Sequence, residues 1–451
     1  MKIKKVKWRN HSILGDLELD FTNDAGIPFK TILFAGENGT GKTSILQTLS
    51  TFLNMDSFEP FDYIEYVIDN QIYKAIPQEQ DNQPNWFFDI IKPDSTRKSI
   101  FSSSSSNRNS ILEDPEDPRH YGCVFSKARA DYKTQKITHT TSKTLDNDKY
   151  DIDNEDDFTS LKQLIVDIQN QDNENYVEQN KTLNNNPLPW PEFFKISKTF
   201  RFKNAFDNFF DNIEYEKVTD LENEKTILFK KNNNSISIDN LSTGEKQIVF
   251  RGIYLLKNSN NLKGSTIMID EPELSMHPKW QQNILKYYKD LFTDADTQKA
   301  QLFLASHSEH VLKDALSDKE NNLVILLWND NGTVKAKRVD APVVLPSITA
   351  AETNYLAFDI VSTDYHIELY GLLQDKTNNN TVKSCDDFIK NSDEYNPVLH
   401  SKISTHNTTT YETLSTFIRN AIHHPDPART YTERDLRISI ELLIKLINQL
   451  P

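Results

Sequence analysis

A glycine-rich turn near the start of the chain has the residue types and the flanks of a phosphate-binding P-loop. The turn has the sequence GENGTGKT at residues 36–43, follows the apolar run 31–35 and leads into a helical pattern. Backbone N–H groups of such a turn can point at one anion, a lysine adds charge at the outer phosphates, and a hydroxyl can hold Mg²⁺. A glycine-rich turn that arose by chance would not need a strand before it and a helix after it. The two flanks therefore favour a P-loop. The predicted nucleotide-binding residues are Gly36, Asn38, Gly39, Thr40, Gly41, Lys42, Thr43 and Ser44, with Thr43 also a metal ligand.

Two later apolar runs end in polar groups that suit hydrolysis of a bound nucleotide. The run 265–269 is followed by Asp270 and Glu271, and the run 301–306 by His307. An acidic pair just past a buried strand of a P-loop protein can orient Mg²⁺ through Asp270 and polarise the attacking water through Glu271. A lone histidine is usually structural, but its place after a second such strand favours a sensor of the γ-phosphate.

A second candidate anion site precedes a helical pattern in the middle of the chain. Residues 241–247 have the sequence LSTGEKQ, and apolar residues at helical spacing follow. A turn of small residues at a helix N-terminus exposes backbone N–H groups at the positive end of the helix dipole. Ser242, Gly244 and Glu245 are therefore predicted to contact nucleotide.

In this order, the P-loop, the LSTGE turn, the Ile-Asp-Glu-Pro-Glu segment and the Ala-Ser-His segment resemble the ABC-type ATPase heads of the family that contains RecF and the SMC proteins. The resemblance implies ATP and Mg²⁺ as cofactors and a homodimer or higher homo-oligomer with head-to-tail heads. ATP on Lys42 of one subunit would be closed over by Ser242 and Gly244 of the other. Glu271 and His307 would then carry out hydrolysis.

Length and composition limit the classes of protein that the chain can belong to. It has 451 residues, of which 37% are apolar and 26% charged, and no apolar run approaches the length of about 18 residues that a membrane span needs. The start lacks a signal-peptide core, so we expect a cytoplasmic protein. Two cysteines exclude a disulfide framework and a cysteine-rich zinc site. The net charge of −15 restricts any nucleic-acid binding to a local basic face.

The predicted fold class is α/β, with an ABC-type P-loop ATPase head, a helical lid insertion and an all-α C-terminal domain. The head comprises residues 1–55 and 235–344, the helical lid with disordered loops comprises residues 56–234, and the C-terminal helical domain comprises residues 345–451. The insertion lacks sustained heptads, so it is not a long coiled coil. Within it, helical stripes are expected at 158–168 and 190–210, and loops or disorder at Ser102–Ser106, Asp146–Asp157 and Asn184–Asn186.

The C-terminal third is helical in pattern and carries a second resemblance. The segments NYLAF (354–358), ELYG (368–371) and RNAIHHP (419–425) resemble PtuA, the ATPase subunit of Septu-type and retron-associated antiphage systems. The resemblance implies an ATPase multimer that recruits a separate HNH-type nuclease and senses phage through nucleotide or DNA state. No arrangement of His and Asn in this sequence resembles an HNH site, which agrees with a nuclease in trans.

Arg419 and His424 leave two alternatives open. Their spacing resembles the Arg-x4-His pattern of HEPN ribonucleases, and an Arg beside a His is a plausible phosphate site. Both residues could instead cap the C-terminal carbonyls of a helix that ends before Pro425, which is the interpretation we favour. The sequence thus predicts a regulator of a partner nuclease, with a self-contained HEPN-like ribonuclease and a RecF-like DNA-repair ATPase as alternatives.

Overall fold

The computed structural model describes residues 1–78, 87–129, 131–153, 158–182, 188–294, 297–339, 344–406 and 408–450. The chain divides into two compact units. The first comprises Met1–Val311 and Asn321–Lys337, and the second comprises Leu312–Glu320 and Arg338–Pro451. None of the helices in the described ranges combines the length and the apolarity that crossing a bilayer requires.

The first unit is built on a seven-stranded sheet in the order β18-β17-β3-β16-β13-β8-β9. Its strands are β3 (Thr31–Gly36), β8 (Cys123–Ser126), β9 (Tyr150–Ile152), β13 (Thr266–Asp270), β16 (Gln301–Ala305), β17 (Asn322–Asp330) and β18 (Thr333–Arg338). The run from β17 to β9 is parallel throughout. Buried on both faces, these central strands are continuous apolar runs, as parallel strands usually are. The predicted α/β fold is confirmed.

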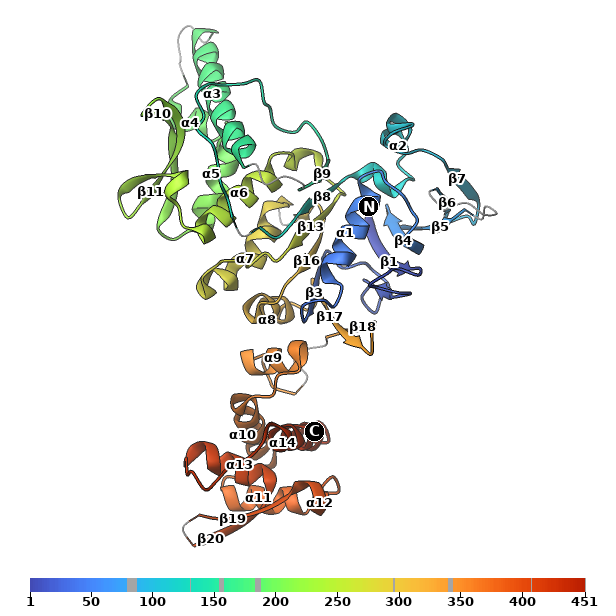
Figure 1. Ribbon diagram of the computed structural model, residues 1–451, viewed down its shortest axis with the longest axis vertical. Helices are drawn as coiled ribbons and strands as arrows, with labels where there is room; N and C mark the ends of the chain where they lie inside the picture. The colour runs from blue at the N-terminus through green and yellow to red at the C-terminus, as the bar shows by residue number, and fades with distance from the viewer. Residues whose placement is uncertain are drawn as a thin grey trace. The chain divides into compact units, whose positions relative to one another are not determined.

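A second, antiparallel sheet has the order β2-β1-β4-β5-β6-β7. Its strands are β1 (Lys2–Trp8), β2 (Glu18–Asp20), β4 (Phe61–Ile68), β5 (Gln71–Pro77), β6 (Phe88–Ile91) and β7 (Arg97–Ile100). Helix α1 (Lys42–Leu53) lies between this sheet and the seven-stranded sheet (Figure 1). One hydrophobic core joins all three: Val6, Leu49 and Phe303 belong to it and are fully buried.

The prediction that residues 56–234 form a helical lid is wrong in two respects. Strand β4 pairs with β1, β5 to β7 continue that sheet, and β8 and β9 extend the central sheet, so the head does not stop at residue 55. Strands β10 (Ile213–Leu221), β11 (Glu224–Lys231) and β12 (Asn234–Ser237) form a further antiparallel sheet. In β4 and β10, buried residues are interspersed with half-buried or exposed ones, so the pattern in the sequence is weak.

Helices make up the rest of the first unit. The expected stripe at 158–168 is part of α3 (Thr159–Thr182), and the expected helix at 190–210 is two helices, α4 (Trp190–Phe194) and α5 (Phe200–Phe209). Helices α2 (Arg108–Glu113), α6 (Thr243–Leu256) and α7 (Pro278–Leu291) and the short strands β14 (Thr293–Asp294) and β15 (Thr297–Gln298) also belong to the first unit. Helix α8 (Glu309–Ser317) begins in the first unit and ends in the second.

The segments that we expected to be loops or disordered differ from one another in structure. Ser102–Ser106 is a turn whose hydroxyls bond one another, for example Ser103 with Ser106 at 2.8 Å. In the acidic stretch, Asp146 accepts a hydrogen bond from Arg201 at 2.9 Å, so its start is an anchored loop. Residues 154–157 of that stretch and Asn184–Asn186 lie outside the described residues.

The second unit has its own core but is not all-α. Its helices are α9 (Ala350–Phe358), α10 (Thr363–Thr377), α11 (Val382–Lys390), α12 (Pro397–His400), α13 (Leu414–His423) and α14 (Glu433–Asn448). The hairpin of β19 (Ser401–His406) and β20 (Thr409–Thr413) contradicts the all-α prediction. Tyr411 belongs to β20, and α13 starts after Thr413, whose side chain accepts a hydrogen bond from the backbone N–H of Thr416.

Candidate nucleotide-binding and hydrolysis site

The P-loop lies at the carboxyl end of β3 and runs into α1. Gly36, Gly39 and Gly41 have φ angles of 134°, 81° and 90°, which only glycine adopts at low cost. A Cβ on Gly36 would stand 2.1 Å from the carbonyl oxygen of Leu327 on the neighbouring strand. The loop therefore needs glycine here for both its backbone conformation and its fit against β17.

We expect Gly36→Ala to lower the free energy of unfolding by about 3 kcal/mol or more, because a clash with backbone adds to backbone strain. Gly39→Ala is the matched control: its φ is also positive, but open space surrounds the position of its Cβ. The free energy of unfolding of this control variant should fall by only about 1 kcal/mol. Urea denaturation of the two variants measures the difference, and equal losses would contradict the close approach to Leu327.

Lys42 begins α1 and is buried. Its Nζ donates hydrogen bonds to the carbonyl oxygens of Gly36 at 2.8 Å and Glu37 at 2.7 Å. The side chain thus lies across the mouth of the loop, where the outer phosphates of a nucleotide would approach. Burial lowers the pKa of Lys42 to about 8, although nearby carboxylates, first among them Asp270, oppose the shift.

The acidic pair and the histidine meet the P-loop at the same edge of the sheet. The carboxylate of Asp270 accepts a hydrogen bond from Thr43 Oγ1, with distances of 3.0 and 3.3 Å to its two oxygens. The Nε2 of His307 lies 3.6 Å from Glu271 Oε1, and both side chains are about one-third exposed. Parallel strands in the order β3-β16-β13 bring these three segments together.

Glu271 has a backbone conformation that residues other than glycine seldom adopt. Its φ is 44°, and its N–H donates to the carbonyl oxygen of Ala305 at 2.9 Å. Strain of this kind persists where the surroundings hold it, often at functional sites. The turn directs Glu271 to the edge where His307 lies.

Glu273 is a site residue that sequence reasoning did not single out. One of its buried carboxylate oxygens accepts hydrogen bonds from Ser306 Oγ at 2.8 Å, from His307 N at 2.8 Å and from Ser308 N at 3.1 Å. It thereby holds the turn after β16 that carries His307. The only sequence signal was its place two residues after Glu271.

Ser242, Gly244 and Glu245 lie at the N-terminus of α6, with Ser242 exposed. Ser242 and Glu245 form a capping box: Ser242 N donates to Glu245 Oε2 at 2.8 Å, and Ser242 Oγ accepts from Glu245 N at 3.4 Å. Glu245 also pairs with Lys231 at 2.6 Å. The hydrogen bonds of Ser242 and Glu245 thus stay at this helix end and do not reach the P-loop of the same chain.

Gly244 packs too closely for a side chain. A Cβ there would lie 2.7 Å from the carbonyl oxygen of Ser275. The N-terminus of α6, which carries Ser242, therefore packs directly against the segment that follows the acidic pair.

The match of residues 32–313 to a family model decides the family. The model is described as an AAA domain, putative AbiEii toxin, Type IV TA system. The chain belongs to this family. The matched region of the AAA domain contains the P-loop, α6, the acidic pair and His307, and the predicted P-loop ATPase class is confirmed.

Relatives and solved structures resemble parts of this AAA-domain protein. Over 98 residues it is 37% identical to the retron Vc95 probable ATPase of Vibrio cholerae serotype O1 biovar El Tor, and over 94 residues 38% identical to the retron Ec83 probable ATPase of Escherichia coli. These matches span 20% and 19% of the chain and 18% and 16% of those relatives. An SMC head bound to the C-winged helix domain of ScpA is 13% identical, with a TM-score of 0.40 over 76% of this chain and 99% of that one. The SMC head domain from Thermotoga maritima is 13% identical, with a TM-score of 0.36 over 75% of this chain and 99% of that one.

The residues of the AAA domain fit ATP and Mg²⁺. Thr43 Oγ1 and the Asp270 carboxylate already point at one another, and both are oxygen donors of the kind that Mg²⁺ takes beside nucleotide phosphates. Burial raises the pKa of Asp270, with Thr43 opposing the shift. Thr43 and Asp270 would hold a divalent cation, whose charge would offset the burial of the carboxylate charge.

ATP affinity should fall as the pH rises through 8. With the pKa of Lys42 lowered to about 8, its ammonium is present below that pH and is lost above it. We therefore expect the Kd for ATP to rise about tenfold between pH 7.5 and 9.5. Isothermal titration calorimetry across this range measures the effect, and Lys42→Ala, which has no such group, should show a flat profile.

Arg251 is the second residue that sequence reasoning missed. It lies on α6, is buried, and its guanidinium donates to the carbonyl oxygens of Glu271 at 3.1 Å, Asp270 at 3.1 Å and Lys127 at 2.7 Å. An arginine inside an apolar helical stripe gives no sequence signal of such contacts. It ties α6 to the backbone of the acidic pair.

Arg419 and His424 belong to the second unit and lie at the end of α13. Arg419 Nη1 donates to Asn420 Oδ1 at 3.0 Å. His424 is the C-cap residue, is exposed, and its backbone N–H donates to the carbonyl oxygen of Asn420 at 2.9 Å. The role of these two residues stays a prediction.

Proposed function

We propose that this chain binds and hydrolyses ATP by an ABC-type mechanism. The observation that carries the proposal is the meeting of Thr43, Asp270, Glu271 and His307 at one sheet edge. Backbone N–H groups of the P-loop and Lys42 would bind the phosphates, Thr43 and Asp270 would hold Mg²⁺, which neutralises developing charge, and Glu271 would accept a proton from the attacking water. His307 Nε2 would contact the γ-phosphate. Desolvation lowers the pKa of His307, which favours the neutral ring.

We further propose that a second copy completes the nucleotide site. Ser242 is exposed at a helix N-terminus, where the positive end of the helix dipole favours an anion. In a head-to-tail dimer, two such ends would each face the P-loop of the partner.

A mixing experiment tests the shared site. Lys42→Ala and Ser242→Arg should each abolish turnover alone, while an equal mixture forms heterodimers that hold one intact site. About half of the dimers would be mixed, so about a quarter of the wild-type turnover should return. A mixture as inactive as its components would contradict the shared site.

The biological role that we propose is the sensor or regulatory subunit of an antiphage complex that controls a separate HNH-type nuclease acting on DNA in the cytoplasm. Three observations support this: the retron probable ATPases among the relatives, the toxin–antitoxin family description, and the PtuA-like segments of the second unit. The test is phage plating on cells that express the chain with and without its neighbouring genes. Protection that needs a nuclease gene and intact Lys42 supports the role; protection by this chain alone contradicts it.

Two alternative functions remain: a self-contained HEPN-like ribonuclease and a RecF-like repair ATPase. Assays on the purified chain distinguish them from the regulatory role. RNA cleavage that disappears in the Arg419→Ala/His424→Ala variant would favour the first. ATP-dependent binding to gapped DNA with no partner would favour the second.

A further inference from the structure

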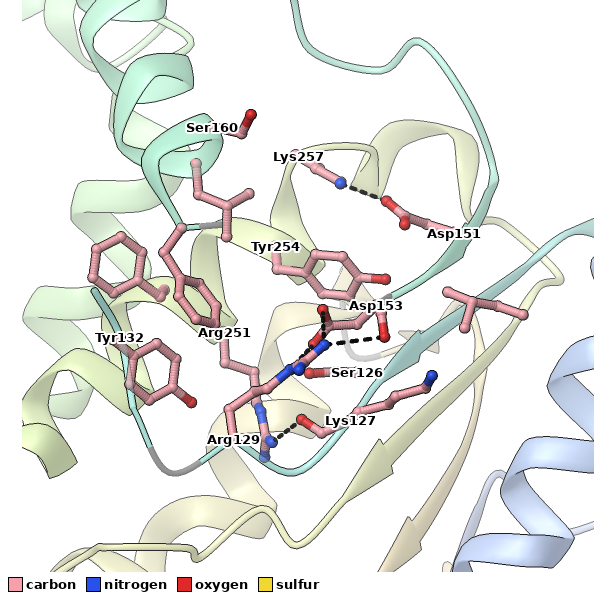
Figure 2. A pocket seen from close by; sticks show the side chains of 14 residues that line it. Ser126, Lys127, Arg129, Tyr132, Asp151, Asp153, Ser160, Arg251, Tyr254 and Lys257 are labelled. Atoms are coloured by element: carbon pink, nitrogen blue, oxygen red, sulfur yellow. Dashed lines mark hydrogen bonds and ion pairs between the residues drawn. The ribbon is translucent and has the colours of Figure 1, made fainter. Parts of the chain in front are cut away.

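The guanidinium of Arg251 holds two successive backbone carbonyls of the turn that carries Glu271. Arg251 lies on α6 and is 3% exposed. Its Nη1 donates to the carbonyl oxygen of Glu271 and its Nη2 to that of Asp270, both at 3.1 Å. Nη2 also donates to the carbonyl oxygen of Lys127 at 2.7 Å, a hydrogen bond that Figure 2 marks at the wall of a pocket of about 330 Å³. One planar group therefore joins α6, the segment after β8 and the peptide groups on either side of Glu271.

The backbone of Glu271 needs such support. Its φ is 44°, and Pro272 follows it. A residue before proline favours an extended backbone with φ near about −120°, and the left-handed region is costly for any residue with a Cβ. The N–H of Glu271 donates to the carbonyl oxygen of Ala305 at 2.9 Å. Because this N–H is bonded to β16 and the carbonyls on both sides are bonded to Arg251, the turn cannot relax toward the extended region without breaking a hydrogen bond.

Helix α6 is itself closely packed at the point from which Arg251 extends. The next residue is Gly252, and a Cβ there would stand 2.6 Å from the hydroxyl oxygen of Tyr287 on α7 and 2.9 Å from a ring carbon of Phe206 on α5. The backbone of α6 therefore lies directly against both neighbouring helices. Close packing of this kind leaves little room for movement, so the guanidinium starts from a fixed position.

We propose that Arg251 is a positioning residue for ATP hydrolysis. It does so by keeping the carboxylate of Glu271 beside His307, where Glu271 Oε1 and His307 Nε2 are 3.6 Å apart. A relaxed backbone at Glu271 would move this carboxylate away from the attacking water, and a misplacement of about 1 Å can slow a reaction about a hundredfold. The inference rests on the proposed function, because the position of Glu271 matters to turnover only if Glu271 acts on that water.

The first test replaces Arg251 with lysine, which keeps the charge but presents a compact ammonium instead of a planar fork. We expect kcat for ATP to fall about thirtyfold, while the Kd for ATP stays within about threefold of the wild type. Phosphate release measures kcat, titration with a fluorescent ATP analogue measures the Kd, and a thermal melt shows that the variant is folded. Arg251→Gln, which avoids a buried ammonium, is a second variant with the same expected result.

Arg201→Lys is the matched control. Arg201 also donates to a backbone carbonyl of α6, that of Leu256 at 3.0 Å, and pairs with Asp146 at 2.9 Å, but it makes no hydrogen bond to the turn at Glu271. The same loss of the planar fork at this arginine should leave kcat unchanged. A fall in kcat as large as that of Arg251→Lys would assign the effect to α6 as a whole and overturn the proposal.

A double variant separates positioning from general stabilisation. In single-turnover assays, Arg251→Lys/Glu271→Gln should hydrolyse ATP as slowly as Glu271→Gln alone, because a residue that acts through Glu271 has nothing left to position. A rate lowered by the product of the two separate losses would overturn the proposal. Wild-type kcat in the folded Arg251 variants would also overturn it, as would a Kd for ATP that rises by the factor by which kcat falls. Absence of ATP turnover by the wild-type chain would be a failure of the proposed function instead.

Discussion

Replacing Glu271 with glutamine is expected to lower ATP turnover at least about a hundredfold while ATP still binds. Glutamine keeps the size and shape of the side chain but cannot accept the proton of the attacking water. Nucleotide would remain in the site, so ATP should hold the chain in its closed dimer. Phosphate release measures turnover, and size-exclusion chromatography with ATP measures association.

Glu273→Gln is the control for this variant. Its side-chain oxygen would still accept the hydrogen bonds of Ser306, His307 and Ser308 that the carboxylate accepts. We expect turnover within about threefold of the wild type. Unchanged hydrolysis by Glu271→Gln would remove Glu271 from the mechanism, and a loss as large in the control would assign the effect to the turn after β16.

Replacing Lys42 with alanine is expected to weaken ATP binding about a hundredfold or more. The ammonium lies at the mouth of the P-loop on the carbonyls of Gly36 and Glu37, and no other cation that contacts these two carbonyls is present among the described residues. A charge-assisted contact to phosphate in a partly buried site is worth several times a surface ion pair. Titration with a fluorescent ATP analogue measures the affinity.

Lys286→Ala, at an exposed position of α7, is the control for Lys42→Ala and should bind ATP as the wild type does. Lys42→Ala should remain folded, because it also removes the desolvation of the buried ammonium. Wild-type affinity in this variant would show that the turn at 36–43 is not the nucleotide site.

The chemistry of the candidate site was largely predictable from the sequence because each part of it is local. A buried strand, a turn and a helix start within a dozen residues specify the P-loop, and the runs before Asp270 and His307 specify strands that end in polar groups. Parallel strands present such ends at one sheet edge, so the meeting of Thr43 with Asp270 follows once the strands are recognised.

Tertiary structure alone decided the elements whose partners lie far away in the chain. Strand β4 pairs with β1, and β9 pairs with β8. Only part of β4 and no residue of β9 is buried, which leaves a faint pattern in the sequence. Sheet pairing depends on which distant strand offers free backbone groups, and no local signal encodes that choice. The three carbonyls around Arg251 likewise come from residues 127, 270 and 271 and converge only after folding.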